Sequence, residues 1–444
     1  MAVISIDIGT TKICAIAVDE NTGIILDSVS EKNVFIDTGN LSDKIQDAEA
    51  IFLKVEKLYN SLSVKYSDIT LVSITGQMHG IVYVDRQGNA VSPLYTWQDE
   101  NANSEFNNGY SYAEYLSMTS KYEMASGYGL TTYYYHLMNE MLPEEACRIV
   151  TIQDYAVMRF TGKKNPVTHI SNAAGLGMFD IKKGCFDENA MKAAGLDTSF
   201  LPEVADDNMI IGETAEGVPV CVAIGDNQAS FIGATHDVEE CIHVNIGTGS
   251  QVSIAIAEND FDKFNEICID SDLEIRPLDK NRYLVAGSSL CGGRAFALIE
   301  EFFRSVLDMA GIDKYESLYP AMDKLLEKAD SIGNTLIVST KFCGTRRNPS
   351  ERGNIGDIGC DNLTPANLMV GVLDGIAQEL YDMILPAITL KGFGNPELVS
   401  SGNGIRKNKM LSKILSDKFQ IPLHTPGNPE EAAYGAALFV LRGR

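Results

Sequence analysis

The chain opens with two apolar runs separated by a short polar turn. Residues 3–8 (VISIDI) and 13–18 (ICAIAV) are mostly Ile, Val and Ala, and GTTK lies between them at 9–12. Runs of β-branched residues bounded by glycine are typical of buried strands. We therefore expect a β-hairpin at the start of the chain.

Apolar positions predict further strands and helices. Residues 45–60 carry Ile, Ala, Phe, Val and Leu at helical spacing, which indicates an amphipathic helix. We expect strands at 69–74, 81–84, 218–224, 283–286 and 398–400, and helices at 227–234, 294–307, 365–384 and 429–438. Residues 97–215, with frequent Asn, Gly and Tyr, are expected to form an insertion on the first lobe rather than a separate domain.

An internal repeat divides the chain into two halves. The segment IHVNIGTGSQVSIAIA at 242–257 matches ISIDIGTTKICAIAVD at 4–19 position by position. The same strand–turn–strand unit at the start of each half indicates a duplicated lobe, with two unrelated hairpins as the alternative. A chain of 444 residues is also long enough for two cores. We expect domains at 1–234 and 240–444, joined by a polar linker.

The net charge argues against polyanionic partners such as nucleic acid and anionic lipid. The chain has 60 acidic and 36 basic residues, which gives a formal charge of −24. A surface this negative repels nucleic acid and anionic lipid, so we expect no nucleic-acid and no membrane partner. A small anionic ligand remains compatible, because a local nest of backbone N–H groups holds phosphate against the overall field.

Cysteine and histidine usage argues against disulfides and metal cages. The nine cysteines include no C-x-x-C pair, and the six histidines show no zinc-ligand spacing. The N-terminus has no basic start, and every apolar run is far shorter than the roughly 18 residues of a membrane span. These features predict a cytoplasmic protein with reduced thiols.

The two Gly-Thr turns are candidate phosphate-binding loops. Glycine lets the backbone approach an anion, and successive N–H groups of such a turn point outward. Threonine hydroxyls and one lysine add donors, and Asp7, before the first turn, can orient water around Mg²⁺. The simpler interpretation is that both are ordinary hairpin turns. The candidate residues are Gly9, Thr10, Thr11, Lys12, Gly247 and Thr248.

Asp226 stands between a predicted strand and a predicted helix. The helix N-terminus favours the carboxylate form, which can accept a proton from a hydroxyl that attacks a γ-phosphoryl group. The alternative is a helix N-cap, which alone would account for an aspartate at this position.

Two polar segments are candidates for binding a polyol. Gln77, Met78 and His79 lie between two glycines at a strand end, and a Gln–His pair suits hydrogen bonding to hydroxyls. Trp97, the one tryptophan, comes shortly before Asp99, so a ring and a carboxylate are available for a sugar. Each segment also has a structural interpretation, as a surface histidine or as an aromatic residue followed by a polar turn.

Two glycine-containing segments are candidates for contact with a nucleoside. Gly292-Gly293 and Gly402-Asn403 would let the backbone lie against a flat adenine and its ribose. The alternative is turn geometry, since Asn403 tolerates the left-handed backbone region.

Five segments, in order along the chain, resemble the motifs of the FGGY carbohydrate kinases. They are DIGTTK at 7–12, GQMHG at 76–80, GDNQ at 225–228, GTGS at 247–250 and AYGAA at 433–437. The resemblance spans nearly the whole chain. It implies an α/β fold of two lobes with a duplicated actin/Hsp70/hexokinase-like (ribonuclease H-like) core and an active site in the interdomain cleft.

The resemblance also implies roles for the candidate residues. It implies ATP and Mg²⁺ as cofactors and phosphoryl transfer to a sugar hydroxyl, with Asp226 as catalytic base and as a substrate contact. Gln77, Met78, His79, Trp97 and Asp99 fall where such kinases hold the sugar, and Gly292, Gly293, Gly402 and Asn403 fall beside the nucleoside. The partners would be a small-molecule sugar and a nucleotide, and the assembly is left open, with a homodimer as one alternative.

Four stretches look more like kinases of sedoheptulose, which make the 7-phosphate, than like other members of the family. They are TWQD at 96–99, ASGYG at 125–129, TIQDY at 151–155 and NAA at 172–174. Xylulose kinases more usually show Trp-Asn-Asp at the first of these, and GNG at 402–404 departs from a more typical triple glycine. D-xylulose is the alternative substrate. A non-catalytic or chaperone-like ATP-binding member of the actin/Hsp70 superfamily is the alternative class.

Overall fold

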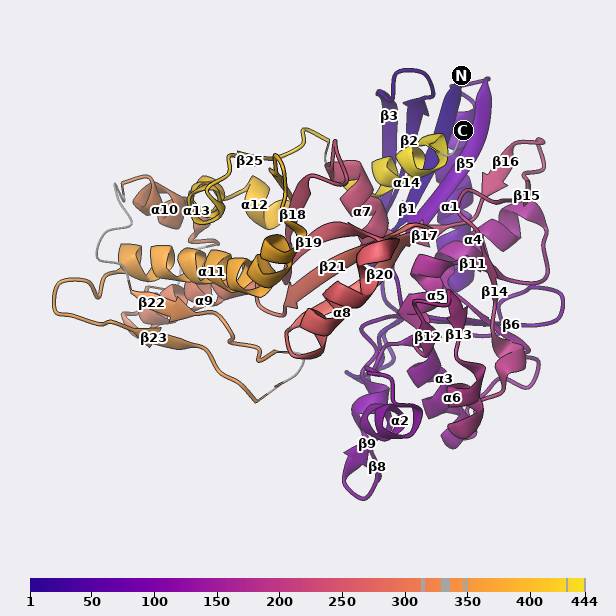
Figure 1. Ribbon diagram of the computed structural model, residues 1–444, viewed down its shortest axis with the longest axis horizontal. Coiled ribbons are helices and arrows are strands. Elements are labelled where there is room, and N and C mark those ends of the chain that lie inside the picture. Colours follow the sequence, from indigo (N-terminus) through magenta and orange to yellow (C-terminus); the bar gives the residue numbers. More distant parts are fainter. Residues whose placement is uncertain (313–315, 329–335, 346–347, 349, 429, 443–444) are drawn as a thin grey trace. The chain divides into compact units, whose positions relative to one another are not determined.

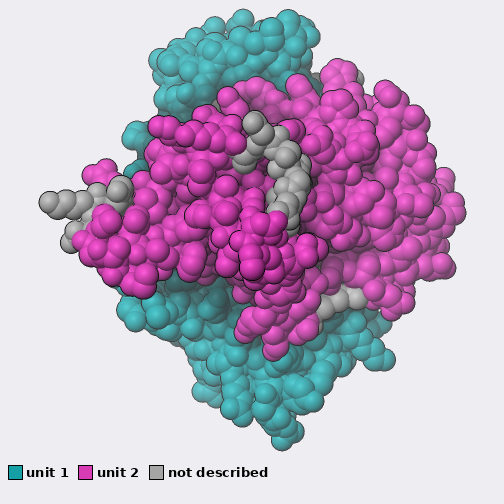
Figure 2. Space-filling view, turned by 90° about the vertical axis from the view of Figure 1, so that its left-hand side faces the viewer, with its two compact units in different colours: residues 1–233, 277–281, 430–444 teal, residues 234–276, 282–429 magenta. Residues whose placement is uncertain are grey.

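The chain folds into two units in the computed structural model, which describes residues 1–312, 316–328, 336–345, 348, 350–428 and 430–442. Unit 1 comprises Met1–Gly233, Pro277–Asn281 and Glu430–Arg444, and unit 2 comprises Ala234–Arg276 and Arg282–Pro429 (Figure 2). The expected domains 1–234 and 240–444 are continuous in sequence, so they differ from these units in two later segments. Those segments group with unit 1 because residues 277–281 hydrogen-bond to it and the last helix packs on its sheet.

A seven-stranded sheet forms the centre of unit 1 (Figure 1). Its strands are β1 (Ala2–Ile8), β2 (Lys12–Asp19), β3 (Ile25–Lys32), β5 (Ile69–Gly76), β15 (Ile210–Glu213), β16 (Pro219–Cys221) and β17 (Ile224–Gly225). The order is β15-β16-β5-β1-β2-β3, and β17 also pairs with β5. β2 is antiparallel to its neighbours β1 and β3, whereas β1, β16 and β17 are all parallel to β5. The expected N-terminal hairpin is therefore β1–β2, and the expected strand 218–224 is split into β16 and β17.

The sheet of unit 2 repeats this topology. Its strands are β18 (Cys241–Ile246), β19 (Ser250–Ala257), β20 (Leu273–Asp279), β21 (Arg282–Ser289), β24 (Glu397–Ser401) and β25 (Leu423–His424), in the order β20-β21-β19-β18-β24-β25. The run β21-β19-β18-β24-β25 matches β3-β2-β1-β5-β16, with the same parallel and antiparallel pairs. The duplicated lobe inferred from the repeat is thus confirmed, because β18–β19 occupies the place of β1–β2.

Helix α1 (Ala48–Ser63) shows how the apolar pattern becomes packing. It begins at Ala48 rather than at residue 45 because the Asp47 carboxylate accepts a hydrogen bond from the Ala50 N–H and caps the helix. Its apolar face, including Ile51 and Val55, is buried in the core beside the sheet of unit 1. The amphipathic helix predicted from spacing is therefore present.

The insertion after β5 has a hydrophobic core of its own but belongs to unit 1, as expected. Its helices are α2 (Tyr112–Ser120), α3 (Gly129–Met138), α4 (Ile152–Thr161), α5 (Ile170–Leu176) and α6 (Glu188–Ala193). Short strands complete unit 1: β4 (Ile45–Gln46), β6 (Val82–Val84), β7 (Leu94–Tyr95), β8 (Glu105–Asn107), β9 (Tyr110–Ser111), β10 (Arg148–Val150), β11 (Val167–His169), β12 (Phe179–Asp180), β13 (Cys185–Phe186) and β14 (Glu203–Ala205).

Unit 2 carries most of its helices after β21. Its helices and remaining strands are α8 (Phe261–Ile269), α9 (Gly293–Met309), α10 (Tyr319–Leu326), β22 (Ile337–Ser339), β23 (Asn354–Gly356), α11 (Pro365–Lys391), α12 (Asn403–Arg406) and α13 (Lys409–Phe419). All nine cysteines are free thiols. Among the helices in the described ranges, none combines the length and the apolar character needed to cross a membrane.

Two helices of unit 1 touch backbone to backbone. They are α7 (Asp226–Ala234) and α14 (Glu431–Arg442), and the latter also covers β1 and β5 (Figure 1). A Cβ at Gly435 would lie 1.7 Å from the Ala229 carbonyl oxygen, and one at Gly233 would lie 2.0 Å from that of Glu431. Only glycine fits at this crossing, which fixes α7 against the C-terminal helix.

Serine hydroxyls attach α14 to the sheet. Ser5 and Ser73 are opposite each other in the β1–β5 register, and both are buried. The Ser5 hydroxyl donates to the Ala433 carbonyl at 2.6 Å, and the Ser73 hydroxyl donates to the Ala436 carbonyl at 2.7 Å. These bonds satisfy polar side chains that would otherwise be costly inside the sheet–helix interface.

We predict that Gly435→Ala destabilises unit 1 by about 1–3 kcal/mol, because the added methyl group overlaps a carbonyl oxygen of α7 that cannot move alone. The measurement is the urea midpoint followed by the fluorescence of Trp97, the one tryptophan, which lies in unit 1. Gly427→Ala is the control, since a Cβ there meets nothing within 4 Å. An unchanged midpoint for Gly435→Ala would contradict the close crossing.

Candidate functional site

Three parallel strands of unit 1 end side by side. Ile8, the last residue of β1, is in register with Gly76, the last residue of β5, and Gly76 is in register with Gly225, the last residue of β17. Because these strands run parallel, the segments that follow them leave the sheet at one edge. The hairpin turn at 9–11, the loop at 77–80 and Asp226 are therefore brought together, although they are far apart in sequence.

Side-chain amides hold the carbonyl groups of the first hairpin turn. The Asn33 Nδ2 donates to the Gly9 carbonyl at 3.1 Å, and the Gln46 Nε2 donates to the Thr10 carbonyl at 2.7 Å. The backbone N–H of Asn33 donates to the Thr11 carbonyl at 2.9 Å. All three turn carbonyls are thus satisfied by the protein.

The N–H groups of the same turn have no such partners. Within the part of the chain that the structure describes, the N–H groups of Gly9, Thr10 and Thr11 donate to no acceptor. Consecutive N–H groups without an internal acceptor, on a turn whose carbonyls are bound by the protein, are suited to an anion. A phosphate-binding role for this turn stays a prediction.

Lys12 does not offer a free positive charge to this turn. Its Nζ lies 2.8 Å from both carboxylate oxygens of Glu430, and its side chain is 46% exposed. Glu430 therefore offsets the charge of Lys12, which the sequence offered as a donor to this turn. Any attraction of this turn for an anion comes first from its N–H groups.

Asp7 lies in the penultimate position of β1 with an unusual environment. Burial, together with the charges of Asp226 and Glu430, raises the pKa of Asp7 to about 8, while Lys12 acts to lower it. The Asp7 Oδ1 is buried and meets no hydrogen-bond donor among the described residues. A carboxylate oxygen that lacks a donor and is near other carboxylates fits a cation, or the water bound to one.

The loop after β5 links the turn to the insertion. Gln77 is buried, accepts from the Thr10 hydroxyl at 3.1 Å and donates to the Gln46 Oε1 at 2.8 Å. Met78 is also buried, and its sulfur lies against Gly225 and 3.6 Å from the Asn227 Nδ2. These two residues therefore support the turn and Asp226 rather than project away from them.

His79 is held in a strained backbone conformation. Its φ is 72°, in the left-handed region that a non-glycine residue rarely adopts. Its ring is stacked on that of Tyr128 with a centroid distance of 4.7 Å and an interplanar angle of 4°. Its Nδ1 lies 2.7 Å from the Gly175 carbonyl oxygen, which can only accept, so this nitrogen carries a proton. The ring is thus oriented by two contacts.

Trp97 and Asp99 lie on the loop that follows β7, and the structure uses them differently. The Trp97 side chain is 48% exposed, and its Nε1 donates to the Thr10 hydroxyl at 3.1 Å. Asp99 is buried, which raises its pKa, and its carboxylate accepts from the N–H groups of Lys44 and Asn101. Trp97 is thus half exposed and bonded to the turn, whereas Asp99 is buried and bonded to the backbone of two loops.

The second hairpin turn is in unit 2 and has the same polarity as the first. The N–H groups of Gly293 and Arg294, at the start of α9, donate to the carbonyls of Gly247 and Thr248 at 2.9 and 3.0 Å. Among the described residues, the N–H groups of Thr248 and Gly249 donate to no acceptor. In unit 2 the N-terminus of α9 therefore binds the turn carbonyls, a role that the side-chain amides of Asn33 and Gln46 have in unit 1.

A cavity of about 1080 Å³ adjoins this turn, and its lining belongs to unit 2. Of the predicted nucleotide-binding residues, Gly247, Thr248, Gly293, Gly402 and Asn403 line it. Gly292 does not, because it packs on the turn itself: a Cβ there would lie 2.4 Å from the Gly249 carbonyl oxygen. The left-handed backbone falls on Gly402, with a φ of 89°, and not on Asn403, which starts α12.

Sequence reasoning missed three residues of the first site. Asn33 and Gln46 orient the turn, and Glu430 pairs with Lys12. Asn33 and Gln46 are polar residues at the ends of strands, where no periodic signal marks them. Glu430 directly precedes the recognised Ala-Tyr-Gly-Ala-Ala helix, but nothing in the sequence indicates that this helix packs on the first lobe.

We predict that Gln46→Leu weakens the binding of ATP, the nucleotide expected from the resemblance, about tenfold. The change removes the donor to the Thr10 carbonyl, so the turn can rotate this oxygen toward the phosphates; the loss corresponds to about 1.4 kcal/mol, within the range of one hydrogen bond. Calorimetry measures the affinity, and Gln87→Leu, at an exposed glutamine, is the matched control. Unchanged affinity in folded Gln46→Leu protein would refute this role.

Comparison with known proteins places this geometry in a family. Residues 2–240 match the N-terminal domain of the FGGY family of carbohydrate kinases, and residues 245–443 match its C-terminal domain. The sedoheptulokinase of Mus musculus is 27% identical over 84% of this chain and 81% of its own length. The xylulose kinase of Staphylococcus xylosus is 24% identical over 99% of this chain and 90% of its own.

A solved structure shows the same fold. The crystal structure of Plasmodium falciparum glycerol kinase with ADP has a TM-score of 0.78 at 19% identity, and the match covers 99% of this chain and 88% of that one. The expected α/β fold with a duplicated core is thereby confirmed. With family matches over both halves, this chain belongs to the FGGY family of carbohydrate kinases and is a phosphotransferase.

Proposed function

We propose that this kinase transfers the γ-phosphoryl group of ATP to the terminal hydroxyl of sedoheptulose and forms sedoheptulose 7-phosphate. The observation that carries the proposal is the common edge of β1, β5 and β17, where the anion-binding turn, the Gln-Met-His loop and Asp226 follow adjacent strand ends. Phosphoryl transfer needs an anion site, an acceptor site and a base together, and these three segments supply candidates for each.

The proposed base is Asp226, the first residue of α7. Its carboxylate accepts the proton of the sugar hydroxyl while that oxygen forms a bond to the γ-phosphorus. The bond from this phosphorus to the bridging oxygen breaks, and ADP leaves with the electron pair. The helix N-terminus stabilises the carboxylate in its ionised form before the transfer.

Each hairpin turn is a proposed phosphate contact within its own unit. The N–H groups of the turn at 9–11 in unit 1, and those of Thr248 and Gly249 in unit 2, lack internal acceptors among the described residues. The cavity in unit 2 is the proposed site of the nucleoside, because Gly247, Gly293, Gly402 and Asn403 are among the residues that line it. Exclusion of water from the hydroxyl and phosphate would favour the sugar as acceptor.

Asp7 is the proposed ligand of Mg²⁺, through water. Its buried and unpartnered Oδ1 fits this role, and no group of three or more His, Cys, Asp or Glu side chains in the described ranges forms a metal cage. That combination suits magnesium, which keeps most of its waters and is held largely by nucleotide phosphates. Bound magnesium supplies positive charge that offsets the phosphate oxygens during transfer.

The choice of sedoheptulose rests on the surroundings of the proposed sugar site. The stretch 125–129, which resembles the sedoheptulose kinases, contacts three candidate sugar-binding residues. Tyr128 stacks on His79, the Ser126 hydroxyl donates to the Asp99 carbonyl at 2.9 Å, and Gly127 packs on the Trp97 backbone. A stretch that shapes the sugar loops is well placed to set the length of the ketose. The mouse sedoheptulokinase adds support by its similarity.

We predict that Asp226→Asn lowers kcat about 10²–10⁴-fold, the contribution typical of a general base, while ATP still binds. Coupled detection of ADP measures turnover, and calorimetry measures nucleotide affinity. Asp68→Asn, at an exposed aspartate just before β5, is the control. Turnover of Asp226→Asn within tenfold of the unchanged enzyme would exclude this residue as the base.

We predict that kcat/KM is highest for sedoheptulose in a panel of five-, six- and seven-carbon ketoses. The alternative is D-xylulose, which the similarity to the Staphylococcus xylosus enzyme over nearly the whole chain favours. Product identification by NMR locates the new phosphate ester. A clear preference for D-xylulose would overturn the substrate while leaving the kinase chemistry intact.

A further inference from the structure

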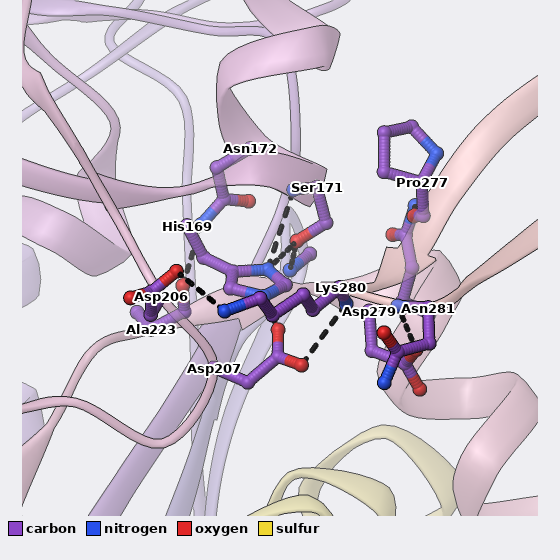
Figure 3. Close-up of polar contacts among 12 residues, drawn as sticks. His169, Ser171, Asn172, Asp206, Asp207, Ala223, Pro277, Asp279, Lys280 and Asn281 are labelled. Atoms are coloured by element: carbon purple, nitrogen blue, oxygen red, sulfur yellow. Dashed lines mark hydrogen bonds and ion pairs between the residues drawn. The ribbon is translucent and has the colours of Figure 1, made fainter. Parts of the chain in front are cut away.

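A hydrogen-bonded chain of Asp207, His169 and Ser171 leads to Gly225, the residue before Asp226. Asp207, His169 and Ser171 belong to unit 1, and Figure 3 shows their side chains pointing toward one another. The His169 Nε2 lies 2.7 Å from the Asp207 Oδ1, and its Nδ1 lies 2.8 Å from the Ser171 Oγ. His169 and Ser171 have no exposed surface, so this is a fixed internal feature.

The donors and acceptors of this chain can be assigned in only one consistent way. The Asp207 carboxylate accepts, so the His169 Nε2 carries a proton, and the Nδ1 is an acceptor because the backbone N–H of Ser171 donates to it. The Nδ1 then accepts from the Ser171 hydroxyl and from the Ser171 N–H at 3.3 Å. The Ser171 Oγ in turn accepts the N–H of Gly225 at 3.0 Å. Each bond polarises the next along one direction.

The chain does not have the arrangement of a hydrolase triad. In serine hydrolases the nucleophilic hydroxyl bonds to Nε2 and the carboxylate to Nδ1, and the hydroxyl is open to substrate. Here the two ring nitrogens are exchanged, Ser171 is fully buried, and its oxygen is occupied by the Gly225 N–H. The three residues therefore serve the backbone rather than act as a nucleophile.

The backbone they hold leads into Asp226. Besides the Gly225 N–H, the Ala223 carbonyl accepts from the Asn172 Nδ2 at 3.0 Å. On the other side of β17, the Thr75 hydroxyl donates to the Ile224 carbonyl at 2.9 Å. The backbone of the three residues before Asp226 is thus hydrogen-bonded on one side to residues at the start of α5 and on the other side to β5.

Asp207 is itself anchored by the segment that follows β20. The backbone N–H of Lys280, the first residue after β20, donates to the Asp207 Oδ2 at 3.0 Å (Figure 3). Near the end of β20 itself, the Pro277 carbonyl accepts from the Gln228 Nε2 of α7 at 2.9 Å. Burial acts to raise the pKa of Asp207, but the bonds from His169 and Lys280 outweigh it and keep the pKa below its usual range. Asp207 thus stays a carboxylate, the form the chain requires.

We propose that His169 and Asp207 are positioning residues for Asp226: they orient the Ser171 hydroxyl, which fixes the Gly225 N–H and hence the start of α7. This inference rests on the proposed function, in which Asp226 is the base. The base must meet the sugar hydroxyl within hydrogen-bond distance, and a displacement of about 1 Å costs roughly 10²-fold in rate. The chain acts on Asp226 without touching the substrate.

Two variants test the chain from opposite ends. Asp207→Asn keeps the shape of the side chain but replaces one acceptor oxygen by an NH₂ donor, which then faces either the proton on the His169 Nε2 or the Lys280 N–H. Ser171→Ala removes the acceptor of the Gly225 N–H. Each is expected to lower kcat about tenfold or more, with the KM for ATP within about twofold of the unchanged enzyme. Ser171→Thr, which keeps a hydroxyl, is expected to restore kcat.

The matched control is Tyr83→Phe, which removes the hydroxyl 3.0 Å from the Nδ1 of another buried histidine, His136, in the separate core of the insertion. If the chain were merely structural, Asp207→Asn and Ser171→Ala, like the control Tyr83→Phe, would lower the unfolding midpoint without lowering kcat per folded molecule. If folded Asp207→Asn keeps a kcat within twofold of the unchanged enzyme, the positioning role is wrong. Asp207→Asn is the variant more certain to fold, because the Asp207 side chain is 24% exposed whereas Ser171 is fully buried.

A measurement that needs no turnover separates this inference from the proposed function. ¹⁵N NMR of histidine-labelled protein, with His169→Gln used for assignment, is expected to show a proton on Nε2 and none on Nδ1. A ring protonated on Nδ1 would overturn the chain of bonds. If instead Asp226→Asn stays active, the proposed base fails while the NMR result stands. If Asp226→Asn is inactive and Asp207→Asn is unaffected, only the positioning role fails.

Discussion

The parallel pairing of β1 and β17 with β5 is the constraint on which the chemistry of unit 1 depends. Ile8, Gly76 and Gly225 are the last residues of these strands and share one register. Parallel strands must leave a sheet at the same edge, so this register alone gathers segments from three distant parts of the sequence. A slip of one residue in any strand would turn its side chains to the opposite face and carry its loop away from the other two.

Among the described residues, the two hairpin turns have the same pattern of bonded carbonyls and unbonded N–H groups, although different residues bind the carbonyls in each. In each turn the carbonyls are bound by the protein and some N–H groups are left without an internal acceptor in the described ranges. Asn33 and Gln46 bind the carbonyls of the first turn, whereas the start of α9 binds those of the second. In both turns the carbonyls are held by other parts of the protein, a feature that a Gly-Thr pair alone does not provide and on which the proposed anion binding depends.

Much of the fold could be predicted because apolar runs and spacing mark strands and helices directly. The hairpins, α1, α9, α11 and the duplication follow from such patterns. The grouping of residues 430–444 with unit 1 could not, since it depends on glycine contacts between α7 and α14 that no local pattern encodes. Within the site, glycines and Asp226 stand out by type and position. Gln46 and His169 do not, because their roles come from partners distant in sequence.

The packing of α14 on β1 and β5 has a consequence for the order in which the protein matures on the ribosome. The strands emerge early, but the carbonyls that accept from Ser5 and Ser73, and the glycine that meets α7, are synthesised only after all of unit 2. Until then the face of the sheet that α14 covers is exposed in the nascent first unit, and α7 lacks its contact with α14. Completion of unit 1 is thus deferred until unit 2 has been translated, and the first unit exposes apolar surface during that interval.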